Sequence, residues 1–158
     1  MAKVTRAVTA LERAGVEFSV RTYELTIEAD TYGESVAAEL GVEPDRLFKT
    51  LLASVDGSPT VGIVPVSGRL SMKSLARAAG GKRAELIAPA DAERLTGYVT
   101  GGISPFGQKK RLPTVLDSSA MTFSTICCSA GQRGLQVELA PGDLVGILGA
   151  TVADIADV

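Results

Sequence analysis

Residues 47–66 read LFKTLLASVDGSPTVGIVPV. Two runs in this stretch, Leu47 to Val55 and Thr60 to Val66, are rich in apolar and β-branched residues, which favour strands. Asp56-Gly57-Ser58-Pro59 separates them and is typical of a tight turn, so the stretch predicts a β-hairpin. The first run is apolar at nearly every position, as expected for a central strand whose two faces are both covered. We therefore expect the rest of the chain to be organised around this hairpin.

Lys49 places a charge in the middle of that buried strand, where a charge is costly. Because side chains alternate along a strand, Lys49 shares a face with Leu51, whereas Thr50 shares the opposite face with Phe48 and Leu52. The residues leave two interpretations open. The side chain either extends along the strand to a wet edge, or it holds its ammonium group for a ligand.

Apolar spacing and capping signals divide the remaining chain into short elements. Helices are predicted at Lys3–Ala14, Glu34–Leu40, Ser71–Ala79 with Ser71 as N-cap, Pro89–Leu95 and Pro141–Leu148. Further strands are predicted at Val16–Tyr23, Ala84–Ile87, Thr114–Asp117, Thr122–Cys128 and Leu135–Leu139, and a loop at Gly97–Leu112. With no repeat or linker in 158 residues, we expect an α+β fold. It is a single domain over 1–158, with a mixed, mostly antiparallel central β-sheet flanked by helices.

The composition excludes several kinds of chemistry. The chain has no histidine, which removes Ser-His and Cys-His nucleophilic pairs and the common zinc-hydrolase ligand sets. Cys127 and Cys128 are adjacent, so in a strand they point to opposite faces, which is poor geometry for a disulfide or a shared metal. We expect both to be buried apolar thiols, and we expect no metal and no cofactor.

Sixteen Lys and Arg against 18 Asp and Glu give a net charge of −2, which argues against a protein that wraps nucleic acid electrostatically. The main basic concentration is Lys109-Lys110-Arg111, with Lys82-Arg83 and Arg133 as candidate neighbours. Such a run binds RNA phosphates or is simply a solvated surface, and composition leaves both open. No apolar stretch is long enough to span a membrane, and no signal peptide is recognisable, so we expect a cytoplasmic protein.

Two further features stand out beside Lys49: the glycine-rich loop Gly101 to Pro105 and the turn that begins at Ser129. A glycine loop is usually a turn, and only sometimes a place where backbone N–H groups approach a ligand. Ser129 before a glycine is more often a turn residue than a nucleophile. None of the three features identifies an activity alone.

Taken together and in order, these segments resemble the YbaK/EbsC family, from the first helix to the tail at Ala153-Asp154-Ile155-Ala156. The resemblance is carried by Thr22-Tyr23-Glu24, Phe48-Lys49-Thr50-Leu51-Leu52, Gly97-Tyr98, the run GGISPFGQKKRLPT over residues 101–114, and Arg133-Gly134-Leu135. The broader group includes the editing domain inserted in bacterial prolyl-tRNA synthetases. The sequence is similar to the branch of Cys-tRNA(Pro) deacylases.

The resemblance implies a hydrolase that removes cysteine from tRNA(Pro), with tRNA(Cys) as a second carrier and prolyl-tRNA synthetase as a candidate partner. It implies that the substrate's own thiol attacks the aminoacyl ester, so the protein supplies no nucleophile. It assigns catalysis to Lys49 and Gly101. Substrate contacts fall on Tyr23, Tyr32, Thr50, Gly102, Ile103, Ser104, Pro105 and Ser129, and phosphate contacts at the pocket mouth on Lys109, Lys110 and Arg111.

One position departs from the family. The family's Gly-Leu-Asp-Ile pattern reads Gly134-Leu135-Gln136-Val137 here, so a neutral amide replaces an acidic pocket contact. Two alternatives to the cysteine deacylase stay open. The chain is an editing deacylase for another small amino acid such as alanine, or a non-catalytic module that binds tRNA or a synthetase.

Overall fold

The computed structural model describes residues 5–24 and 32–157, and the side chains of 32–34 lie outside that description. The predicted hairpin is confirmed: β2 (Phe48–Val55) and β3 (Ser58–Pro65) pair antiparallel along their whole length. The turn is shorter than predicted, because Ser58 pairs with Val55 and only Asp56 and Gly57 remain outside the strands. Both have positive φ, 49° and 88°, which is the backbone of a two-residue hairpin turn.

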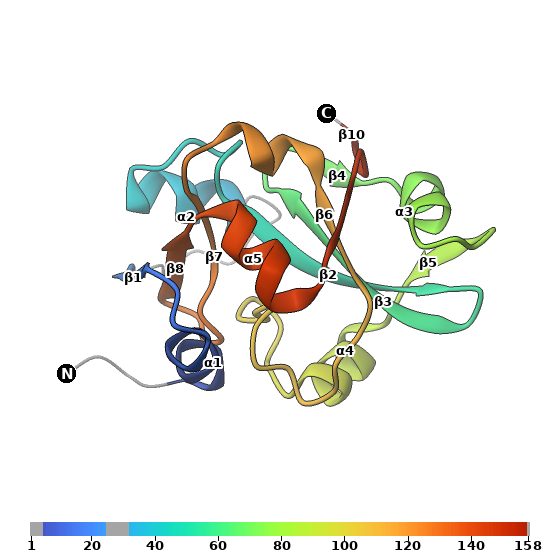
Figure 1. The fold of residues 1–158 in the computed structure, drawn as a ribbon, viewed down its shortest axis with the longest axis horizontal. Coiled ribbons are helices and arrows are strands. Elements are labelled where there is room, and N and C mark those ends of the chain that lie inside the picture. Colours follow the sequence, from blue (N-terminus) through green and yellow to red (C-terminus); the bar gives the residue numbers. More distant parts are fainter. Residues whose placement is uncertain (1–4, 25–31, 158) are drawn as a thin grey trace.

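The hairpin lies inside a five-stranded sheet of order β5-β2-β3-β6-β9 (Figure 1). The other strands are β5 (Ala84–Leu86), β6 (Thr114–Asp117) and β9 (Thr151–Ala153). β2 is antiparallel to both neighbours, whereas β3-β6 and β6-β9 are parallel. The sheet is therefore mixed, as predicted.

The remaining described strands form two smaller antiparallel sheets. β1 (Phe18–Thr22), β8 (Leu135–Leu139) and β7 (Ile126–Ser129) make a three-stranded sheet in that order. β4 (Arg69–Leu70) pairs with β10 (Ala156–Asp157). Antiparallel pairs thus outnumber parallel ones, but they are spread over three sheets instead of one.

Helices cover both faces of the five-stranded sheet and the outside of the three-stranded one (Figure 1). They are α1 (Arg6–Ala14), α2 (Tyr32–Leu40), α3 (Met72–Ala78), α4 (Pro89–Thr96) and α5 (Pro141–Leu148), with a 3₁₀ helix at Ser118–Thr122. None of the helices among the described residues has the length and apolar character needed to cross a membrane.

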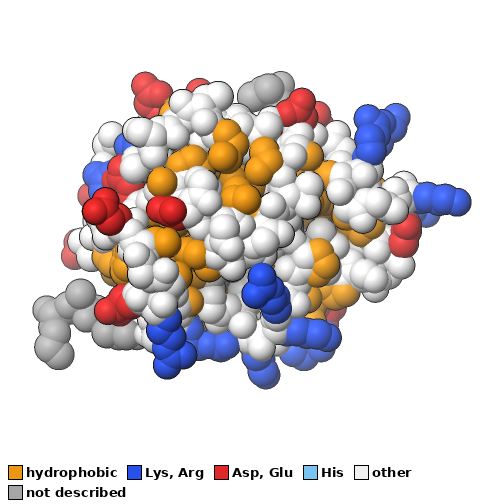
Figure 2. Space-filling model, viewed as in Figure 1, with side chains coloured by type: hydrophobic (Ala, Val, Ile, Leu, Met, Phe, Trp, Pro, Cys, Tyr) orange, Lys and Arg blue, Asp and Glu red, His pale blue; other side chains and the backbone are white. Residues whose placement is uncertain are grey.

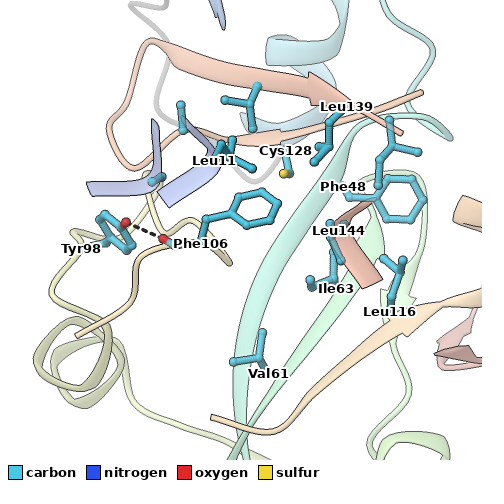
Figure 3. Packing of buried hydrophobic residues seen from close by; sticks show 14 of the residues in the cluster. Leu11, Phe48, Val61, Ile63, Tyr98, Phe106, Leu116, Cys128, Leu139 and Leu144 are labelled. Atoms are coloured by element: carbon cyan, nitrogen blue, oxygen red, sulfur yellow. Dashed lines mark hydrogen bonds between the residues drawn. The ribbon is translucent and has the colours of Figure 1, made fainter. Parts of the chain in front are cut away.

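The two faces of β2 enter different parts of the core. Phe48 belongs to the main core cluster, which also contains Leu139 of the three-stranded sheet, Leu11 of α1 and Leu144 of α5 (Figure 3). Ala53, on the opposite face, packs with Leu75 of α3. The prediction of a strand buried on both faces is therefore confirmed, and it explains why this strand is the centre of the fold.

Two predicted elements are present but begin later than predicted, for local reasons. The strand predicted at Thr122–Cys128 begins only at Ile126, because the carboxylate of Asp117 accepts from the Ser119 N–H and starts a 3₁₀ helix. The first helix begins at Arg6, because the Thr5 hydroxyl caps it by accepting from the Val8 N–H. The predicted helical positions 3 and 4 lie outside the described residues.

The loop from Gly97 to Leu112 has no helix or strand, as predicted, but hydrogen bonds hold it in one shape. The Tyr98 hydroxyl donates to the Phe106 carbonyl at 2.5 Å (Figure 3). Gln108 Nε2 donates to the Ser104 carbonyl at 3.0 Å, and the Ser104 hydroxyl accepts from the Phe106 N–H. The Phe106 ring is fully buried in the main core. Burial also raises the pKa of Tyr98, so its phenol remains a donor.

A Tyr98→Phe variant tests whether that hydrogen bond fixes the loop. Removing the hydroxyl leaves the buried Phe106 carbonyl without its donor, so we expect the free energy of unfolding to fall by about 1–3 kcal/mol. Urea denaturation measures it. The neighbouring exposed Val99 offers a control, since Val99→Ala should change stability by less than about 0.5 kcal/mol. Equal stability of the two variants would show that the bond contributes nothing.

Candidate functional site

A cavity lies along a part of β2 that, among the described residues, has a paired strand on one side only. β5 pairs with β2 no further than Ala53, and on the other side of the gap Leu47 forms a bridge with Cys127 of β7. Between these points the edge of β2 is open. It borders a cavity of about 200 Å³ lined by Val36, Leu47, Phe48, Lys49, Thr50, Leu51, Val66, Thr100, Gly101, Ile103, Ser129 and Gln136. This volume is below that of drug-sized sites and suits a small group.

The open edge presents backbone groups as well as side chains. The Leu52 carbonyl accepts from the Ile87 N–H, so Leu52 directs its backbone toward the β5 side of the strand. Antiparallel pairing alternates this direction residue by residue, and Thr50 is two residues from Leu52. The N–H and carbonyl of Thr50 therefore point toward the cavity edge, where they can bond a ligand.

Two buried polar atoms at the cavity have no hydrogen-bond partner among the described residues: Thr50 Oγ1 and Gln136 Oε1. The residues are only 8% and 6% exposed. An unsatisfied buried acceptor costs about 1–3 kcal/mol, so each such group in a folded protein requires an explanation. A bound ligand that donates hydrogen bonds explains both atoms at once.

Lys49 lines the same cavity from β2 and is half-buried. The strand directs its side chain to the site, and it is the single charged residue among the described lining residues. In a small, largely apolar cavity a fixed cation interacts strongly with negative charge that develops nearby.

The glycine loop forms the opposite wall through Thr100, Gly101 and Ile103. Gly101 has a φ of 89°, and a Cβ there would lie 2.4 Å from Nε of Arg133. That Nε donates to the Thr100 carbonyl at 3.2 Å. Only glycine allows the Arg133 guanidinium to lie against the loop at this wall, so a second cation is held beside the cavity.

An ionic network supports the strand that carries Gln136. Glu138, two residues along β8, pairs with Arg21 at 3.3 Å and with Arg46 at 3.1 Å. The Thr125 hydroxyl donates to it at 2.6 Å, and this bond, with Arg46, lowers the pKa of Glu138. These contacts join β1 and β8 to the segment that enters β2, and so fix the spacing of the cavity walls.

Five of the residues predicted for the site line one cavity: Lys49, Gly101, Thr50, Ile103 and Ser129. They come from β2, the glycine loop and the end of β7, which are distant in sequence. Gln136, noted in the sequence only as a departure, lies opposite Ser129 in the β7–β8 register.

Other predicted contacts do not line the cavity. Tyr23 is buried behind it in a cluster with α2, the Ser104 hydroxyl is used inside the loop, and Pro105 lines a different hollow. Gly102 is buried against the backbone of Arg133, and a Cβ on Gly102 would lie 2.9 Å from the Arg133 backbone nitrogen. The side chain of Tyr32, the first residue of α2, lies outside the described residues.

The predicted basic cluster is also rearranged. Lys109 and Lys110 are exposed and do not line the cavity, and the Arg111 guanidinium donates to the Leu148 carbonyl. The backbone N–H groups of Lys82 and Arg83 donate to the carboxylate of Asp56 at the hairpin turn, away from this run.

Cys127 and Cys128 are buried and unpaired, as predicted. They belong to different core clusters on the two faces of β7. Burial raises the pKa of both thiols, so neither supplies a thiolate at neutral pH. No group of three or more metal-ligating side chains occurs in the part of the chain that the structure describes.

Sequence reasoning missed the apolar lining residues. The sequence pattern predicts a core position for Leu47, Phe48 and Leu51. It gives no indication of a binding role for Val36 or Val66. Their role depends on where β5 stops pairing with β2, which no local pattern reveals.

Comparison with known proteins gives concordant matches. A model of the aminoacyl-tRNA editing domain family matches residues 26–147. EbsC of Enterococcus faecalis, provisionally assigned as a Cys-tRNA(Pro)/Cys-tRNA(Cys) deacylase, is 39% identical over 96% of this chain and 92% of its own. ProXp-y of Escherichia coli, a multifunctional Ser/Thr-tRNA deacylase, is 28% identical over 90% and 86%.

The fold also matches a solved structure, described provisionally as a trans-editing enzyme for prolyl-tRNA synthetase. The TM-score is 0.86 at 23% identity, and the match covers 99% of this chain and 100% of that one. The likeness supports the α+β architecture.

A Gln136→Met variant tests whether the unpartnered Gln136 oxygen lowers the stability of the protein in the absence of a ligand. Methionine has a similar shape without the unsatisfied oxygen, so we expect the free energy of unfolding to rise by about 1 kcal/mol, measured by urea denaturation. Gln108→Met is the matched control. This substitution removes the hydrogen bond that Gln108 Nε2 donates to the Ser104 carbonyl, so it should lower the free energy of unfolding. If both substitutions destabilise alike, Gln136 Oε1 has a partner within the protein.

Proposed function

This chain belongs to the aminoacyl-tRNA editing domain family, and on that premise we propose that it is a trans-editing deacylase that removes cysteine from Cys-tRNA(Pro). Cys-tRNA(Cys) is the second proposed substrate. The similarity to EbsC over nearly the whole of both chains supports this assignment. We also propose that residues 1–158 form one editing domain.

The observation that carries the proposal is a small cavity with hydrogen-bonding groups and a cation but no nucleophile–base pair. None of the described lining residues is a histidine, a cysteine or a carboxylate. The Ser129 hydroxyl accepts from the Gly131 N–H, which suits a turn residue. Such a site supports a reaction in which the substrate brings its own nucleophile.

In the proposed reaction the cysteine sulfur attacks the carbonyl carbon of its own ester. An S–C bond forms, the bond from that carbon to the ribose oxygen breaks, and the thiol proton ends on the ribose oxygen of the released tRNA. Water then opens the cysteine thiolactone. The cavity holds the thiol close to the ester, which accounts for much of the acceleration in reactions of this kind.

We assign the roles of the lining residues from their positions. The Lys49 ammonium stabilises the negative charge that develops on the carbonyl oxygen. The backbone of Gly101 and Ile103 shapes the wall opposite. Thr50 and Gln136 accept hydrogen bonds from the amino group, which gives the two unpartnered oxygens their donor.

Deacylation of tRNA(Pro) charged with cysteine, serine or alanine tests the substrate and the mechanism together. We expect rapid release of cysteine, with serine and alanine remaining close to the spontaneous rate, because neither carries a thiol. Acid-gel analysis of radiolabelled tRNA measures the three rates. Equal release of cysteine and alanine would exclude attack by the substrate thiol.

A Lys49→Ala variant tests the cation. Loss of a preorganised group that stabilises the transition state typically lowers the rate by about 10²–10³-fold, and we expect a loss of this size in kcat for Cys-tRNA(Pro). Lys73→Ala on the exposed outer side of α3 is the matched control and should retain activity. Full activity of the Lys49 variant would refute its assignment.

A second candidate is deacylation of serine or threonine, the activity named for the Escherichia coli relative. The observation that favours it is the pair of unpartnered acceptors, because a hydroxyl is a stronger donor than a thiol. Faster release of serine than of cysteine in the same assay would select it. Release of alanine alone would select the small-residue deacylase, and no release would select a binding module.

The proposed partners follow from the substrate. The enzyme binds aminoacylated tRNA, and prolyl-tRNA synthetase is the proposed source of the mischarged molecule.

A further inference from the structure

The outer face of α1 forms a basic surface outside the cavity. Arg6 and Arg13 are seven residues apart and lie on one side of the helix. With Thr5, Thr9, Ala10, Gly107 and Gln108 they line a hollow of about 470 Å³. We call this set of residues the α1 surface.

Arg6, Arg13 and Lys109 are exposed, and none of the three forms an ion pair with another described residue. The ion pairs found between described residues are those of Arg21, Arg46 and Arg94, and none of them includes Arg6, Arg13 or Lys109. A Cβ on Gly97 would lie 2.7 Å from Nη1 of Arg6 and 3.5 Å from Cβ of Lys109, so Arg6 and the base of the Lys109 side chain flank one glycine. Like charges gathered without acidic partners repel each other, and an external polyanion relieves that repulsion.

Charge is also unevenly distributed on the face of the molecule that Figure 2 shows. Figure 2 shows Lys and Arg side chains gathered along the lower edge, over the region of α1 and α4 (compare Figure 1), while most acidic side chains in this view lie along the upper and left edges. A net charge of −2 for the chain is therefore compatible with a locally basic surface around α1.

The glycine loop connects the α1 surface to the cavity. Its first part, through Thr100, Gly101 and Ile103, lines the cavity, and its later part, through Gly107 and Gln108, lines the α1 hollow. A Cβ on Gly107 would lie 2.5 Å from the Arg6 carbonyl, so loop and helix are in close contact. A bound chain whose end enters the cavity thus has a continuous path past Arg133 and over the loop to α1.

We propose that the α1 surface binds the phosphate backbone of the acceptor stem of the RNA whose aminoacylated end lies in the cavity. This inference rests on the proposed function. Arginines on a helix face reach phosphates without reading bases, so the contact adds affinity and orientation but no sequence preference. It supplies the binding energy that a cavity of about 200 Å³ cannot provide alone.

The test compares two esters of cysteine: a charged acceptor-stem minihelix and the 3′-aminoacyl adenosine, which lacks the stem. For the double variant Arg6→Gln/Arg13→Gln we expect KM on the minihelix to rise about tenfold with kcat unchanged. Cleavage of the adenosine ester should stay at the wild-type rate. Each lost phosphate contact should also reduce the slope of log affinity against log salt concentration by about 0.7–0.9.

The matched control is Lys73→Gln/Arg77→Gln, which removes the same charge from the exposed side of α3. If it raises KM as much as the α1 variant, only net charge matters and the proposal is wrong. Because Arg6 also lies against Gly97, the single variant Arg13→Gln, at the end of the helix, checks that the loss is not one of folding. An Arg13→Gln variant with unchanged minihelix KM and salt slope overturns the proposal.

Failure of the proposed function is distinguishable. If the wild-type protein cleaves neither ester, that function is wrong, and fluorescence anisotropy with the uncharged minihelix still tests the surface. Weaker binding by the α1 variants than by the α3 control then supports the proposal, and equal binding refutes it.

Discussion

Between Leu47 and Ala53 one edge of β2 pairs with no strand among the described residues, although both faces of β2 are buried. An exposed edge of this kind leaves backbone groups available and is usually covered. Here the loop from Gly97 and the end of β7 stand away from the edge and enclose a cavity. Phe48 packs on one face of the strand and Ala53 on the other, and this packing sets the position of the edge that carries Lys49 and Thr50.

The position of the opposite wall depends on close backbone approach. Gly101 and Gly102 lie against Arg133 where a Cβ would collide with it, and Phe106 anchors the same loop in the core. A loop without regular structure is thereby held in place by packing and hydrogen bonds. The same loop runs from the cavity wall to the α1 surface. It therefore connects the proposed reaction site of the ester with the surface on which we propose that the RNA lies.

Thr50 and Gln136 combine a cost in stability with the roles that we propose for them at the cavity. Neither buried oxygen has a hydrogen-bond partner among the described residues, and an unsatisfied buried acceptor costs about 1–3 kcal/mol. The neutral amide at Gln136 keeps a hydrogen-bond acceptor where a carboxylate would add a charge, next to an ionic network in which Glu138 is already satisfied by Arg21 and Arg46.

Residues 47–66 by themselves determined the hairpin, the double burial of β2 and the unusual position of Lys49, because alternation and turn chemistry act over a few residues. The sequence also identified Gly101, Thr50 and Ser129 as candidate site residues. That identification came from the resemblance of whole motifs to a family, and not from geometry. Sequence reasoning failed at Thr122–Cys128, where the Asp117 side chain starts a 3₁₀ helix, and it could not show that β5 stops at Ala53. Only the tertiary structure decided that Gln136 faces the cavity, that Ser104 does not, and that Arg133 rather than Lys110 lies beside it. Those outcomes depend on contacts between segments up to about a hundred residues apart, which no local pattern encodes.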